Sequence, residues 1–174
     1  PLRSERSEWL ATPPAPTLPV AIASGLGDRQ LAYRSLAVML QNLGDEGGRV
    51  ISLKDYDYKL LADWFFLLDE LDPVSNFVPA LAAFYFGAVK APEKLSPLID
   101  YLRAVGNRQG QEKWRYLAHA VYLARYEVED LELAYALAEE LAAHKEEGLP
   151  PWAYQMPAFV LRARGNRLEA AQVM

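Results

Sequence analysis

Paired acidic residues are the side chains in this sequence with the most obvious capacity for acid–base chemistry. The pairs lie close together along the chain, at Asp55/Asp57, Asp69/Glu70, Glu139/Glu140 and Glu146/Glu147. Carboxylate catalysis needs two groups that converge on a substrate in a cleft, one of them with a raised pKa. Adjacent residues on a helix point about 100° apart and do not converge. We therefore interpret these pairs as parts of a solvated face.

The two histidines offer little to a metal site. His119 lies between alanines in an apolar stretch, and no second ligand follows it four residues later. We expect it to be a hydrogen-bonding residue of the core or of an interface. His144 stands near the end of a predicted helix, where an imidazole caps carbonyls and favours the dipole. Asp55-Tyr56-Asp57 begins like a calcium loop, but the glycine and closing glutamate of such a loop are missing. The sequence predicts neither a metal ion nor a cofactor.

Composition removes several other function classes. The chain has no cysteine, which excludes disulfides, zinc–thiolate sites, iron–sulfur clusters and thiol nucleophiles. It contains no Gly-x-Ser-x-Gly, His-Glu-x-x-His, dinucleotide or EF-hand motif. Its formal net charge of −5 argues against a nucleic-acid partner, because such proteins need a basic surface to neutralise phosphates. We interpret one basic cluster as a surface charge pattern; it comprises Arg162, Arg164 and Arg167, with Arg108, Lys113 and Arg115 earlier in the chain. The sequence predicts that the protein is not an enzyme.

Aromatic residues are concentrated between positions 56 and 86. Most of them must be core residues, because aromatic side chains supply much of the apolar area that helices bury. Phe65 and Phe66 are adjacent, however, and adjacent residues cannot both face one helical neighbour. Some rings must therefore meet a third element, the proline-rich N-terminal segment or a partner, unless all are satisfied within the chain. The residues predicted to bind a partner are Tyr56, Tyr58, Trp64, Phe66 and Tyr85.

Helical periodicity, interrupted by glycine and proline, predicts an all-α chain of seven or eight helices. The expected helices cover approximately residues 29–43, 55–71, 75–89, 92–105, 109–126, 130–146 and 151–164, with a last helix from about residue 167. Tyr122 and Phe159 fall on predicted buried faces. No stretch predicts a β-hairpin, and no apolar run is long enough to span a membrane.

The N-terminal residues differ from the rest of the chain. The proline-rich run from Thr12 to Pro19 predicts an extended, polyproline-like segment. We interpret residues 1–27 as an arm or linker and residues 28–174 as a helical domain. Because the chain begins at Pro1 rather than methionine, we interpret it as a piece of a longer protein whose preceding segment could carry a signal or anchor. This interpretation favours the bacterial periplasm or a membrane-anchored position over the cytoplasm.

A repeated pattern links two stretches near the C-terminus. Trp114 and Trp152, 38 positions apart, each begin a helix that leads to a tight turn and an alanine-containing second helix. The run Gly165-Asn166-Arg167-Leu168-Glu169-Ala170-Ala171 is similar to the turn and second-helix start of a tetratricopeptide repeat. Over about residues 109–174 the chain therefore resembles the tetratricopeptide-repeat family. This resemblance implies a short right-handed solenoid of stacked antiparallel helical hairpins.

Together these features predict a non-enzymatic scaffold or adaptor that binds a protein or peptide. Residues 55–107 carry eight acidic and four basic side chains, which would favour a basic partner. The alternative is a structural accessory subunit of a bacterial envelope assembly, tethered through a segment that precedes Pro1. A third possibility, an all-α enzyme, has no motif in its favour.

Overall fold

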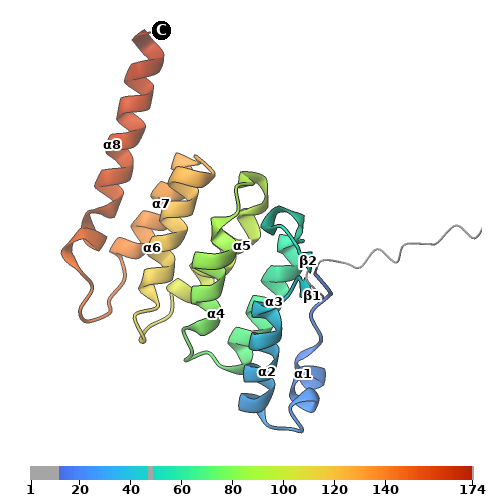
Figure 1. The fold of residues 1–174 in the computed structure, drawn as a ribbon. Coiled ribbons are helices and arrows are strands. Elements are labelled where there is room, and N and C mark those ends of the chain that lie inside the picture. The colour runs from blue at the N-terminus through green and yellow to red at the C-terminus, as the bar shows by residue number, and fades with distance from the viewer. Residues whose placement is uncertain (1–11, 47–48, 174) are drawn as a thin grey trace, which may run out of the picture.

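Helices make up most of the computed structural model, which describes residues 12–46 and 49–173. Eight α-helices lie side by side in hairpin order, from α1 and α2 at one end to α8 at the other (Figure 1). The all-α prediction is confirmed for these residues. Among them, no helix is both long enough and apolar enough to cross a bilayer.

The α-helices have these bounds: α1 Leu18–Ser24, α2 Arg29–Gln41, α3 Tyr58–Leu71, α4 Phe77–Ala80, α5 Ser96–Gly106, α6 Trp114–Tyr122, α7 Leu131–Ala142 and α8 Pro151–Val173. Shorter helical turns extend or connect them, namely the 3₁₀ turns η1 Leu53–Asp55, η3 Phe86–Ala88 and η4 Pro92–Lys94 and the π-helical turns η2 Leu81–Tyr85 and η5 Leu123–Glu127. Three helices begin at aspartate N-caps. The side chains of Asp28, Asp57 and Asp130 accept backbone N–H groups at the starts of α2, α3 and α7.

Three local predictions are wrong. Residues 18–24 form α1 instead of an extended arm, because Pro19 lies in the first turn, where a helix tolerates a missing N–H. Asp45–Glu46 (β1) pairs antiparallel with Arg49–Val50 (β2), although no hairpin was predicted. The expected turn at Gly165-Asn166 is absent, and α8 continues through it to Val173. Its C-terminal half projects beyond α6 and α7 (Figure 1).

The helices recur at a regular interval along the second half of the chain. α4, α6 and α8 begin at Phe77, Trp114 and Pro151, at equal intervals of 37 residues. Two ion pairs, Lys90–Glu127 and Arg103–Glu140, also join side chains that are 37 residues apart. The residues of these two pairs are therefore neighbours in space although they lie one interval apart in the sequence.

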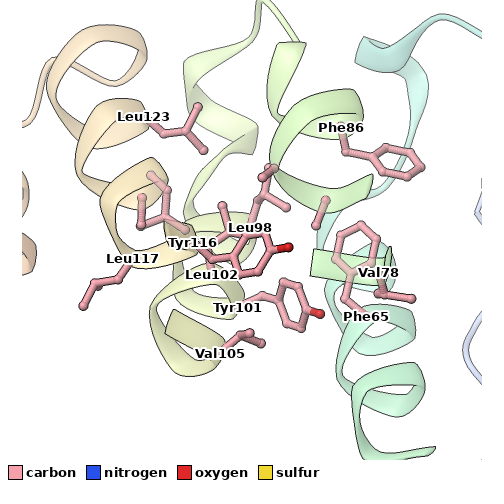
Figure 2. Packing of buried hydrophobic residues seen from close by; sticks show 14 of the residues in the cluster. Phe65, Val78, Phe86, Leu98, Tyr101, Leu102, Val105, Tyr116, Leu117 and Leu123 are labelled. Carbon is pink, nitrogen blue, oxygen red and sulfur yellow. The ribbon is translucent and has the colours of Figure 1, made fainter. Parts of the chain in front are cut away.

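One continuous core runs through the stacked helices. Figure 2 shows part of it, where Phe65 from α3, Leu102 from α5 and Leu123 from η5 contribute to the same cluster. The Phe65 ring lies 5.2 Å from the Tyr101 ring and 5.5 Å from the Phe86 ring. Helices that are distant in the sequence therefore bury their apolar faces in one shared core.

The proline-rich segment packs on the start of α3. The Thr12 hydroxyl is buried and accepts a hydrogen bond of 3.0 Å from the Asp57 backbone N–H. The Trp64 indole N–H donates to the carbonyl oxygen of Pro13 at 2.8 Å. The arm therefore covers one end of α3.

We expect Thr12→Val to lower the free energy of unfolding by about 1 kcal/mol, because it removes the acceptor of a part-buried Asp57 N–H. Thr17→Val is a matched control, since Thr17 is exposed and makes no side-chain capping bond to α1. Urea unfolding of both variants measures the difference. Equal stability of the two variants would show that the arm does not stay on α3 in solution.

Candidate functional site

Three of the five predicted partner-binding residues lie in the core. Tyr56, Tyr58 and Trp64 are at most 4% exposed. Their polar atoms are satisfied within the chain: the hydroxyl of Tyr56 donates to the Leu43 carbonyl, and that of Tyr58 donates to the Phe86 carbonyl at 2.9 Å. These three side chains are not surface anchors in this fold. Aromatic type made them candidates, but segments distant in the sequence cover all three side chains.

Phe66 and Tyr85 do reach the surface, with exposed fractions of 40% and 45%. The Phe66 ring packs edge-on against Tyr101 at 5.1 Å, and the Tyr85 ring packs edge-on against Phe86 at 5.0 Å. No ring contact between described residues joins Phe66 to Tyr85. The structure therefore does not bring the two together into one site, and their role in binding stays a prediction.

A row of aromatic rings crosses from η2 to η5 over α6. The Phe84 and His119 rings are 5.0 Å apart, those of His119 and Tyr122 are 5.6 Å apart, and those of Tyr122 and Tyr126 are 5.2 Å apart. We call these four residues the aromatic row. Phe84 is 67% exposed and Tyr126 is 55% exposed, so both ends of the row face solvent.

The His119 side chain serves as a packing ring within the aromatic row. Burial lowers the pKa of its imidazole, and a hydrogen bond with the Ala83 backbone raises it by a smaller amount. The imidazole is therefore neutral at pH 7 and packs as an aromatic ring. Among the described residues, no group of three or more histidine, aspartate or glutamate side chains could hold a metal ion.

The aromatic row ends in a groove between α6–η5 and α8. The groove has a volume of about 600 Å³ and is lined by Ala118, Val121, Tyr122, Arg125, Tyr126, Met156, Phe159, Arg162 and Ala163. We call it the α6–α8 groove. Aromatic and aliphatic side chains form most of its wall, and Tyr122 and Phe159 are each 45% exposed, although the sequence predicted both as buried.

A π-helical turn positions the side chains on one wall of the α6–α8 groove. In η5 the Val128 N–H donates to the Leu123 carbonyl, five residues earlier, at 2.9 Å. This wider turn follows directly from α6 and carries Arg125 and Tyr126. Single π-helical turns within α-helices frequently occur at functional sites.

The charge in the α6–α8 groove is positive. Among the described residues, its charged lining side chains are Arg125 and Arg162, with no carboxylate. The Arg125 guanidinium lies over the Tyr126 ring at 4.7 Å. Of the basic cluster noted in the sequence, Arg164 and Arg167 have side chains that lie outside the described residues. The positive groove contrasts with the net charge of −5 of the whole chain.

A second, shallower hollow contains the acid pair Asp55/Asp57. Its volume is about 410 Å³, and Lys59, Glu93 and Lys94 also line it. The Asp57 carboxylate accepts the N–H groups of residues 59 and 60 as the N-cap of α3, while Lys94 Nζ donates to the Tyr56 carbonyl at 3.0 Å. Asp57 and Lys94 are thus engaged in holding the chain together, which favours a structural role.

A buried charged cluster lies between α3, α5 and the start of α6. Asp69 forms an ion pair with Arg108, and Lys113 Nζ donates to the Ser75 carbonyl at 2.5 Å. Burial raises the pKa of Asp69, and the Arg108 charge acts in the opposite direction. Burial lowers the pKa of Lys113, and the Asp69 charge partly offsets this effect. Neither hollow described above is lined by the cluster, so we assign it to holding α3, α5 and the start of α6 together.

His144 does not take the capping role expected of it. Its side chain is buried in the turn after α7, and both ring nitrogens lack a hydrogen-bond partner among the described residues. Two residues further along, the Glu146 carboxylate accepts the backbone N–H groups of Gly110 and Glu112, each at 3.1 Å, and so ties this turn to the segment before α6.

Comparison of the chain with protein-family models, curated proteins and solved structures finds no significant match. The resemblance to tetratricopeptide repeats thus rests on the sequence pattern alone and stays a prediction.

Sequence reasoning missed the α6–α8 groove, although two signals were present. Tyr122 and Tyr126 are four residues apart, a spacing that places both rings on the same side of a helix. Arg125 and Arg162 each follow an apolar run, Val121–Ala124 and Ala158–Leu161. Neither signal showed that the two segments face each other across a groove.

Proposed function

We propose that this chain is a non-enzymatic protein-interaction module in which helical hairpins stack as a short solenoid. The equal 37-residue interval between helix starts and the ion pairs one interval apart support this arrangement. The module holds a protein segment on the surface formed by the aromatic row and the α6–α8 groove.

The observation that carries this proposal is the group of solvent-facing rings that lead into an open groove. Tyr122, Tyr126 and Phe159 are each 45% exposed or more and line the same groove. Tyrosine and phenylalanine are enriched at protein interfaces, where they supply large contact area at low conformational cost. The groove has the concave shape and mainly apolar wall of a ligand site.

The test is selection of binders from a phage-displayed library of random dodecapeptides on the immobilised chain. We expect selected peptides to bind the native chain and to lose about tenfold or more in affinity with Tyr122→Ala, Tyr126→Ala and Phe159→Ala, because each substitution removes an anchor.

The matched control is Tyr154→Ala. Tyr154 is a 52% exposed aromatic residue of α8 that does not line the groove. Circular dichroism checks that all variants keep their helices. The proposal fails if no peptide is enriched, or if the groove variants bind as tightly as the control variant.

A further inference from the structure

The α6–α8 groove is a positive site on an acidic protein. Arg125 belongs to η5 and Arg162 to α8, so the two guanidinium groups come from opposite walls of the same groove. The chain as a whole has 18 basic and 23 acidic residues. The described lining of the groove therefore carries positive charge, whereas the chain as a whole is negative.

Four ion pairs between described residues engage other cations. They join Lys90 to Glu127, Arg103 to Glu140, Arg108 to Asp69 and Arg115 to Glu112. Glu127, the acid nearest in sequence to Arg125, is thus engaged by a lysine from the preceding hairpin. Arginine presents a planar fork of donors that matches a carboxylate, and this donor set faces the groove from two sides.

The apolar wall selects against a simple inorganic anion. Met156 and Phe159 of α8 line the groove together with Val121 and Tyr122 of α6. A ligand that fills this space must bring apolar surface together with negative charge. A volume of about 600 Å³ accommodates a few side chains of a peptide, and the groove is open to solvent at its rim.

We infer that the α6–α8 groove binds an acidic segment of a partner protein in which aspartate or glutamate alternates with large apolar residues. This inference rests on the proposed function and names the chemistry of the partner. Carboxylates of the segment pair with Arg125 and Arg162, and its apolar side chains pack on Tyr122, Tyr126 and Phe159. This inference differs from the sequence-based expectation, in which the acidic residues of 55–107 favoured a basic partner.

Two labelled synthetic peptides test the inference. One repeats the unit glutamate–leucine, and the other has lysine in place of every glutamate. Fluorescence anisotropy with the whole chain should show binding of the glutamate peptide that weakens as salt is added, because exposed charges are screened. The lysine peptide should bind at least about tenfold more weakly.

Charge reversal in the groove is the decisive variant. Arg125→Glu with Arg162→Glu should weaken the glutamate peptide by about tenfold or more. Arg34→Glu with Arg115→Glu changes the net charge by the same amount at exposed sites outside the groove and should leave binding within about twofold.

Each other outcome overturns the inference. The inference of an acidic partner is contradicted if the lysine peptide binds as tightly as the glutamate peptide or more tightly. It is also contradicted if both double variants weaken binding of the glutamate peptide equally. A third contradicting result is a single-stranded oligonucleotide that displaces the glutamate peptide and binds the groove more tightly than that peptide does. If library peptides still depend on Tyr122, Tyr126 and Phe159 but not on the arginines, the proposed function stands and only the acidic partner fails.

Discussion

Gly106→Ala is expected to lower the free energy of unfolding by about 2 kcal/mol, although alanine is the better helix former. Gly106 is the last residue of α5, and its backbone lies against α6. A Cβ atom at this position would lie 2.3 Å from the backbone nitrogen of Leu117 and 2.7 Å from its Cα. Both are backbone atoms, so no rotamer change relieves the clash and the two helices must separate. Overpacking of this kind typically costs about 1–3 kcal/mol.

The matched substitution is Gly165→Ala in α8. The Cβ of an alanine at position 165 would have no heavy atom within 4 Å apart from its own helix. We expect this variant to be unchanged or stabilised by up to about 1 kcal/mol, because alanine has the higher helix propensity.

Thermal unfolding measures both glycine variants, with a decrease in Tm of roughly 4–8 °C expected for Gly106→Ala. A Tm at or above that of the native chain would contradict the close approach of α5 and α6. A clear loss of stability in Gly165→Ala would instead indicate a turn at this glycine, as the tetratricopeptide pattern predicted.

Stability is expected to fall steeply above pH 10, because several tyrosines are buried as neutral phenols. Burial raises the pKa of Tyr33, Tyr58, Tyr101 and Tyr116 above the ordinary value of 10.0. Above that pH the unfolded chain loses phenol protons that the folded chain still holds. Stability is therefore complete below pH 10.0 and declines as the pH rises toward the folded-state pKa values.

This decline in the free energy of unfolding is large relative to the total stability of a typical domain. Each such tyrosine contributes a slope of about 1.4 kcal/mol per pH unit within its window. Lys113 acts in the opposite direction: burial lowers its pKa, so the cost of burying its ammonium falls as the pH rises toward 10.5. Four phenols outweigh one amine, so the net effect above pH 10.0 is a loss of stability, drawn from a total of only about 5–15 kcal/mol.

Urea unfolding between about pH 8 and about pH 11 measures the slope, and Tyr101→Phe identifies one contributor. The Tyr101 hydroxyl is buried and has no hydrogen-bond partner among the described residues. This variant should show a shallower alkaline slope and, at neutral pH, unchanged or slightly higher stability. Tyr154→Phe, at an exposed ring, should keep the native slope. A flat alkaline profile of the native chain would contradict the burial of these phenols.

Local signals explain which elements of the fold could be predicted. Asp28 and Asp130 begin helices where the sequence places them, because an N-cap acts on N–H groups two or three residues away. The helix expected from about residue 109 begins only at Trp114, since Gln111 and Glu112 adopt positive φ angles outside helical geometry. The turn expected at Gly165 failed because glycine permits a left-handed residue but does not require one.

Helical character, capping positions and the absence of thiol chemistry were determined by the sequence itself, because they depend on residue type and on neighbours within one or two turns. Only the tertiary structure decided which aromatic rings face solvent. The indole N–H of Trp64 is satisfied by a carbonyl 51 residues away, whereas Tyr126 stays at the edge of a groove that α8 completes. Ring burial depends on which distant segment packs on each face, and helical periodicity specifies a face without specifying its neighbour.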